Sequence, residues 1–145
     1  MFEQFLKRLL APAPKPLGAD EAHLALAALM VRIARADGDY SETEVLRIDR
    51  LLSQLHGLSP FAAARLRGEA EVLEAEAPDT VRFTRALKDA VPHDERMGLM
   101  QTLWAVALAD GDRAAEEEAL IRMVAPLLGI SDRDSALARQ RVEGG

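Results

Sequence analysis

The chain has 145 residues, 49% of them hydrophobic and 29% charged, which is the composition of one globular domain and not of a disordered segment. It contains no cysteine, which excludes disulfides, thiolate catalysis and cysteine-ligated metal centres, and suits a reducing, cytoplasmic setting. Its 18 basic residues stand against 24 acidic ones, and the net charge of −6 argues against a nucleic acid held through its phosphates.

Residues 1–10 form a short amphipathic segment that the sequence predicts to be helical. Five large apolar residues recur at helical spacing on one face: Phe2, Phe5, Leu6, Leu9 and Leu10. A helix of ten residues is marginal in water by itself, so we expect this face to pack on protein, in the same chain, across a homodimer or on an outside protein partner. A membrane surface fits less well, because Lys7 and Arg8 are the only bases and Glu3 offsets one of them.

Residues 11–18 read Ala-Pro-Ala-Pro-Lys-Pro-Leu-Gly and predict an extended linker, because proline at this density is incompatible with a helix. The longest uncharged apolar run, 97–109, has only 13 residues. A membrane-spanning helix needs about 20 such residues, so no transmembrane segment is expected.

Residues 19–145 are predicted to form a single-domain, all-α bundle of about seven helices. Apolar positions at helical spacing, with their capping residues, place the helices near 20–36, 41–57, 60–76, 79–91, 93–109, 113–128 and 131–142. Ser41 and Glu44 form a capping box, and Ser59 and Ser131 can cap two further helices. Met100 and Trp104 are expected in the core. No stretch shows the period-two alternation of a strand.

The chain contains an internal repeat with an offset of 73 residues. When residues 24–55 are placed over 97–128, nine of the 32 pairs are identical, and four of these are contiguous: Ala-Asp-Gly-Asp at 36–39 and at 109–112. Each copy predicts a helix, an Asp-Gly-Asp turn and a second helix with an acid in its first turn. The repeat therefore predicts two pseudo-symmetric helical hairpins.

The two turns are strongly acidic, since nine of the 24 acids lie in the 17 positions of residues 37–44 and 110–118. If the turns meet, their carboxylates repel one another, and a hard divalent cation such as Ca²⁺, Mg²⁺ or Mn²⁺ relieves that repulsion. The candidate metal ligands are Asp37, Asp39, Glu44, Asp110, Asp112 and Glu117. An EF-hand is excluded, because Ile48 and Ile121 occupy the position where that loop needs a bidentate glutamate.

Helix capping is the competing explanation of the same residues. Gly38 and Gly111 can provide the left-handed residue that ends a helix, and Asp39, Ser41 or Asp112 can cap the next one. The glutamates suit the positive end of a helix. Capping explains neither the aspartate before each glycine nor the return of an acid seven residues later.

These residues also resemble a known family. Ala-Asp-Gly with an acid seven residues after the Asp, followed by Leu-x-Gly-Leu-Ser or Leu-Gly-Ile-Ser, is similar to the TerB-like family over about residues 20–132. Those helical domains are named for bacterial tellurite resistance. The resemblance implies an all-α domain whose paired acids chelate metal, in proteins linked to tellurite and other chemical stress. Carried over by position, the acids are Asp37, Glu44, Asp110 and Glu117. Tyr40 and Arg113 depart from the pattern, because the family often has an apolar residue there.

Three functions stay open: an accessory binding module with a cation site, a structural protein-interaction domain without metal, and a metal-assisted hydrolase. The hydrolase is the weakest, because the sequence identifies no base or nucleophile.

The remaining polar residues suggest no site. Four glutamates are expected on a solvated helix face: Glu69, Glu71, Glu74 and Glu76. The histidines His23, His56 and His93 lack a partner at zinc-ligand spacing and are expected on the surface or at helix ends.

Overall fold

The computed structural model describes residues 19–36, 38–76, 80–109 and 115–144. Within these ranges the chain forms seven α-helices and one short 3₁₀ helix, without a strand, which confirms the all-α prediction. In chain order the elements are α2 (Ala19–Ala34), α3 (Glu42–His56), α4 (Pro60–Glu76), α5 (Thr80–Ala90), η1 (His93–Glu95), α6 (Arg96–Ala107), α7 (Ala115–Leu127) and α8 (Asp132–Gly144). The segment 1–10 and the linker 11–18 lie outside the described residues.

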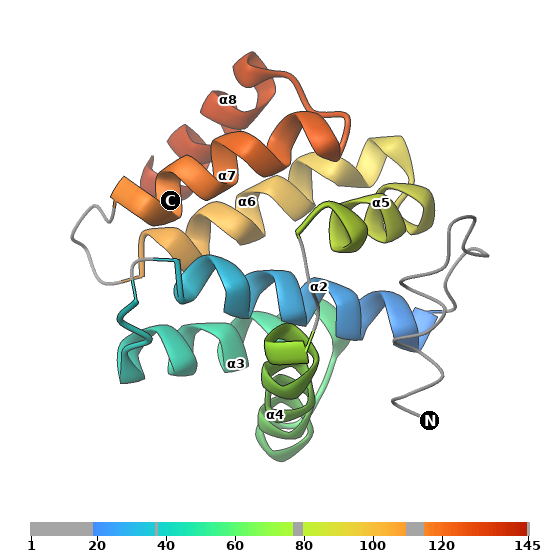
Figure 1. The fold of residues 1–145 in the computed structure, drawn as a ribbon, viewed down its shortest axis with the longest axis vertical. Helices are drawn as coiled ribbons and strands as arrows, with labels where there is room; N and C mark the ends of the chain where they lie inside the picture. Colours follow the sequence, from blue (N-terminus) through green and yellow to red (C-terminus); the bar gives the residue numbers. More distant parts are fainter. Residues whose placement is uncertain (1–18, 37, 77–79, 110–114, 145) are drawn as a thin grey trace.

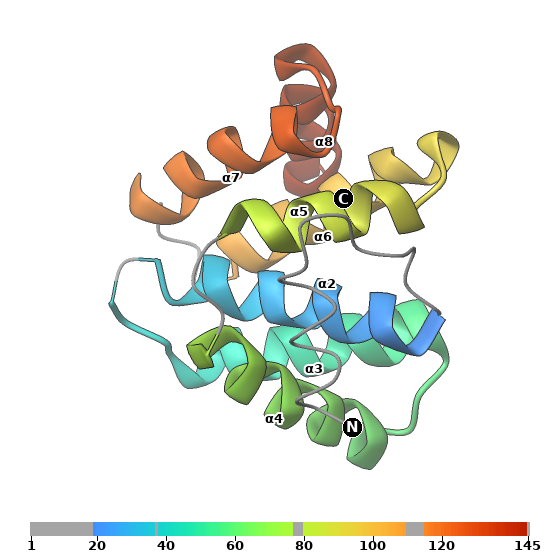
Figure 2. The ribbon, with the colours of Figure 1, turned by 45° about the vertical axis from the view of Figure 1, so that its right-hand side comes forward.

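Helix α2 passes through the middle of the bundle, with α3 and α4 on one side and α5 to α8 on the other (Figures 1 and 2). It contacts α3, α4, α5, α6 and α7, and α6 contacts α3, α7 and α8 as well. Both helices are apolar on most of their circumference, and such helices are stable only when they are surrounded. From residue 25 to residue 34, only Arg32 of α2 is not buried. These two helices therefore form the centre of the core.

The outer helices α3 and α7 each bury one apolar stripe against this centre. Ile48 and Leu52 of α3 are fully buried, as are Ile121 and Val124 of α7. Their spacing of three or four residues places each pair on one helix face. An outer helix of this kind is held by its tertiary contacts more than by its own propensity.

Trp104 of α6 anchors α8. Its side chain is 2% exposed, and its Nε1–H donates a hydrogen bond to Ser135 Oγ at 3.1 Å. Arg139, which like Ser135 belongs to α8, has its guanidinium 4.8 Å from the centroid of the indole ring. Met100, one turn earlier, is fully buried. Both residues are in the core, as the sequence predicts.

The helix ends follow the predicted capping chemistry with one correction. Ser59 Oγ accepts a hydrogen bond from the Ala62 N–H, and Ser131 Oγ accepts one from the Asp134 N–H, both at 3.1 Å. The helix predicted from residue 93 is instead a 3₁₀ turn followed by α6, which begins at Arg96. Pro92 precedes the turn and offers no side-chain cap, so the chain enters α6 through a tighter turn.

The helix bounds repeat with the offset found in the sequence. Helices α2 and α6 end at Ala34 and Ala107, and α3 and α7 begin at Glu42 and Ala115, 73 residues apart in each case. In addition, α4 packs on α2 and α3 as α8 packs on α6 and α7. The three-dimensional equivalence of the two hairpins stays a prediction, to be checked by superposing residues 24–55 on 97–128.

In the described ranges, no helix combines the length and the hydropathy needed to cross a membrane.

Candidate functional site

The first acidic turn begins where α2 ends. Gly38 has φ +81°, a left-handed conformation that side-chain-bearing residues rarely adopt, and its N–H donates to the Arg35 carbonyl at 2.9 Å. Gly38 thus has the left-handed conformation predicted for it, and the chain reverses direction there. Asp39 follows on the surface and is exposed.

Ser41 and Glu44 form the predicted capping box at the start of α3. Ser41 Oγ accepts a hydrogen bond from the Glu44 N–H, and Glu44 Oε1 accepts one from the Ser41 N–H, both at 3.2 Å. Ser41 Oγ–H also donates to Glu44 Oε1 at 3.2 Å. The glutamate is only 1% exposed. A carboxylate is therefore buried at the positive end of a helix, where the macrodipole favours it.

Helix α7 also has a buried glutamate in its first turn. Glu117 is the third residue of α7, as Glu44 is of α3, and it is 2% exposed. Its neighbour Glu118 is 9% exposed and forms an ion pair with Arg139 at 2.5 Å between Oε1 and Nη2. The starts of α3 and α7 lie at the same end of the bundle (Figures 1 and 2). Two buried glutamates at repeat-equivalent positions therefore occupy one end of the molecule.

The structure describes three of the six predicted ligands, namely Asp39, Glu44 and Glu117. Asp37, Asp110 and Asp112 lie outside the described residues, as does Gly111. Among the residues that are described, no group of three or more His, Asp or Glu side chains is placed to hold a metal ion. The metal site thus stays a prediction that depends on the three aspartates of the turns.

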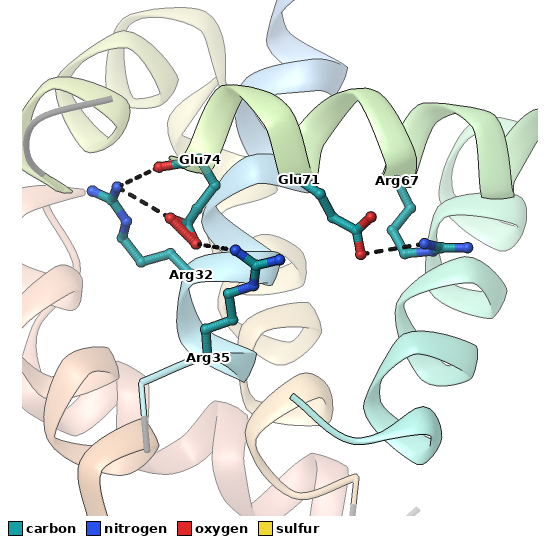
Figure 3. A network of polar contacts seen from close by, with 5 residues as sticks. All are labelled: Arg32, Arg35, Arg67, Glu71 and Glu74. Carbon is teal, nitrogen blue, oxygen red and sulfur yellow. Dashed lines mark hydrogen bonds and ion pairs between the residues drawn. The ribbon is translucent and has the colours of Figure 1, made fainter. Parts of the chain in front are cut away.

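A network of charged residues next to the first turn was not expected from the sequence (Figure 3). Glu74 of α4 lies between Arg32 of α2 and Arg35, which directly follows that helix: Arg32 Nη2 is 3.5 Å from Glu74 Oε2, and Arg35 Nη1 is 3.5 Å from Oε1. Arg32 Nη2 also donates to the Glu74 carbonyl at 2.9 Å. The Glu74 side chain is only 12% exposed, so these ion pairs are partly shielded from water.

The same network extends to α3 through Arg67. Its Nε donates to Asp49 Oδ1 at 2.6 Å, and its Nη1 lies 3.3 Å from Glu71 Oε2. The hydrogen bond to Asp49 is the main cause that raises the pKa of Arg67. The prediction of a solvated glutamate face is therefore wrong for Glu71 and Glu74, which face arginines, while Glu69 and Glu76 are exposed. The error arose because a single helix pattern does not show the arginines of neighbouring helices.

Tyr40 connects the first acidic turn to this network. Its ring lies 5.0 Å from the Arg35 guanidinium carbon and packs against the hydrophobic core. Burial, and secondly the Glu71 carboxylate, raises the pKa of Tyr40, so its phenol stays neutral. Tyr40 thus packs against the core although the family often has an apolar residue at this position. The turn is held at both ends, by Arg35 before it and by Tyr40 after it.

A pair of stacked histidines near the start of α2 was also not predicted from the sequence. The rings of His23 (α2) and His56 (α3) stack with their centroids 3.5 Å apart and an interplanar angle of 17°. Burial, and secondly the neighbouring His23, lowers the pKa of His56. The two residues are 33 positions apart, so no local spacing indicates the pair. They lie in the wall of a groove of about 570 Å³ between α2, α3, α5 and α6.

Comparison with known proteins gives one match. No curated protein and no solved structure matches the chain. The family described as Tellurite resistance protein TerB matches residues 23–140, which includes all the helices from α3 to α7 and most of α2 and α8. The chain therefore belongs to the TerB family.

Proposed function

We propose that this protein is a non-enzymatic binding module, linked to tellurite or other chemical stress, whose two acidic turns together hold a divalent cation. The ligands would be Asp37, Asp39, Glu44, Asp110, Asp112 and Glu117, and the cation Ca²⁺, Mg²⁺ or Mn²⁺. The observation that carries the proposal is the burial of Glu44 and Glu117 at equivalent positions and at the same end of the bundle. Membership of the TerB family supports the link to tellurite.

The physical argument concerns the cost of buried charge. A carboxylate that leaves water needs compensation. A helix N-terminus contributes about 0.3–1 kcal/mol, and for Glu44 the hydrogen bonds with Ser41 add to this. A divalent cation with oxygen ligands compensates much more strongly. The aspartates of both turns precede these glutamates by five to seven residues in the chain. A cation shared by the two turns would therefore stabilise both helix starts together.

The capping box favours a second candidate, a structural interaction domain without metal. The three hydrogen bonds between Ser41 and Glu44 give this glutamate a role that needs no ligand. In that case the family resemblance would reflect the fold and its helix caps alone. The two candidates differ in one measurable property, which is the response of stability to cations.

The test is thermal unfolding of the full chain, first freed of metal with a chelator and then given Ca²⁺, Mg²⁺ or Mn²⁺ at millimolar concentration. At least one cation should raise the melting temperature, because it binds the folded state. The double variant Asp37→Asn with Asp110→Asn should lose that rise. Asp89→Asn with Asp132→Asn is the control, because it makes the same charge change at two exposed residues outside the turns. Unchanged melting of the wild-type chain in every cation would leave only the structural candidate.

The link to stress is tested separately in cells. Cells that express the wild-type chain should survive tellurite better than cells that express the Asp37→Asn, Asp110→Asn variant at equal level. Equal survival would show that cation binding and tellurite resistance are unrelated in this protein.

A further inference from the structure

The groove with the two stacked histidines has walls that are mostly apolar. Leu26 of α2, Leu55 of α3, Leu87 of α5 and Leu99 of α6 line it. Of these four, Leu55 is 46% exposed, whereas Leu26, Leu99 and Leu87 are at most 9% exposed. Covering the Leu55 side chain would therefore give most of the gain in free energy. A volume of about 570 Å³ is enough for several large side chains. The groove thus offers a hydrophobic docking surface along four helices.

We propose that residues 1–10 of the same chain dock in this groove and place their apolar face on its leucines. The segment carries five large apolar side chains on one face, which suits a groove with leucines on every wall. Docking also solves the problem that a ten-residue helix is marginal in water by itself, because most helix stability in proteins comes from packing of such a face.

The position of the groove in the chain supports this occupant. Helix α2 begins at Ala19, directly after the linker, and its first two turns provide Ala22, His23 and Leu26 to the groove. The eight-residue linker spans at most about 25 Å as an extended proline-rich chain, at about 3.1 Å per residue. A ten-residue helix is about 15 Å long. The segment therefore reaches the groove without leaving its own chain.

The charges of the groove and of the segment are complementary. Asp94 and Glu95 of η1 are exposed residues of the groove lining. The polar side of the segment carries Lys7 and Arg8 next to each other. Opposite charges at the edge of an apolar contact favour one orientation over others more than they add affinity. This pairing favours the chain's own segment over an acidic partner.

The experiment measures how fast trypsin cleaves the full chain after Lys7 and Arg8, followed by mass spectrometry. A docked segment is protected, so Leu6→Glu together with Leu9→Glu should raise the cleavage rate at least tenfold. Gln4→Glu is the control on the polar side of the segment and should change the rate less than twofold. Equal rates for the wild-type chain and the double variant would overturn the proposal.

A second variant blocks the groove and leaves the segment intact. A Cβ built on Gly98, which lines the groove, meets no atom within 4 Å. Gly98→Phe should therefore fill the groove without disturbing α6, and should expose Lys7 and Arg8 to trypsin as the segment variant does. Gly98→Ala, which is too small to fill the groove, should retain protection.

Amide NMR spectra of the ¹⁵N-labelled chain show where the segment docks. The Leu6→Glu, Leu9→Glu variant should shift the amide signals of residues along the groove and leave those of α8 in place. Shifts elsewhere would overturn the choice of site. Protection that depends on protein concentration, together with a dimer in sedimentation, would overturn docking within one chain in favour of a second copy.

Discussion

Replacing Glu44 by glutamine separates the two roles that this carboxylate can have. A capping box accepts glutamine as well as glutamate, so the side-chain oxygen can still accept the hydrogen bond from the Ser41 N–H. The variant loses only the interaction of the negative charge with the helix N-terminus, which is about 0.3–1 kcal/mol. In the presence of a chelator, Glu44→Gln should therefore unfold close to the wild-type temperature.

The cation response should change much more. At a cation concentration 100 times the dissociation constant, binding adds about 2.7 kcal/mol to the stability of the wild-type chain. For a domain of this size that corresponds to roughly 8–10 °C in the melting temperature. If loss of the charge weakens cation binding about a hundredfold, the gain at the same concentration falls to about 0.4 kcal/mol, or roughly 1 °C.

Ser41→Ala is the matched control for Glu44→Gln, because it weakens the cap and keeps the charge. It removes the hydroxyl that accepts the Glu44 N–H and should lower the free energy of unfolding by about 1 kcal/mol, while the carboxylate stays in place. Its melting temperature should fall by roughly 3–4 °C in chelator and still rise with the cation. The assay is circular dichroism at 222 nm on the three proteins with and without cation. If Glu44→Gln gains as much from the cation as the wild-type chain, Glu44 is a capping residue alone and the reasoning fails.

Two further predictions concern other charged groups. The pKa of His56 is lowered in the folded chain, so as the pH falls the unfolded chain takes up a proton before the folded chain does. Neutral His56 therefore costs the folded chain nothing above about pH 6.5, and the free energy of unfolding decreases as the pH falls below that value. Urea unfolding between pH 7.5 and 5 should thus depend less on pH in His56→Gln than in the wild-type chain, and equal slopes would contradict this. Glu74→Gln should lower the free energy of unfolding by about 1–2 kcal/mol, because two arginines lose a shielded partner. The exposed Glu69→Gln should cost less than about 0.5 kcal/mol, and equal losses in urea would refute a special role for Glu74.

The helices could be predicted well because their signals are local. Apolar spacing places the inner face of α3 at Ile48 and Leu52, and the capping box at Ser41 marks where that helix starts. The 3₁₀ turn at residues 93–95 was not predicted, since acidic residues after a proline fit the start of an α-helix equally well.

The candidate site could be predicted only in part. The 73-residue repeat identified Glu44 and Glu117 as equivalent, and both are buried at the start of a helix. The arginines that pair with Glu71 and Glu74, and the stacking of His23 on His56, depend on how different helices pack. Such contacts join residues far apart in the chain, so no helix pattern shows them.

The central place of α2 has a consequence for synthesis of the chain. This helix is made before every described helix that it contacts, the most distant of which is α7. At about 5–20 residues per second, the ribosome needs roughly 5–20 s to go from the end of α2 to the end of α7. During that time the helices that bury the apolar side chains of α2 are not all present, and exposed apolar surface promotes aggregation. The nascent chain is therefore most vulnerable while α2 has emerged and α7 has not, and this is the interval in which a chaperone would act on it.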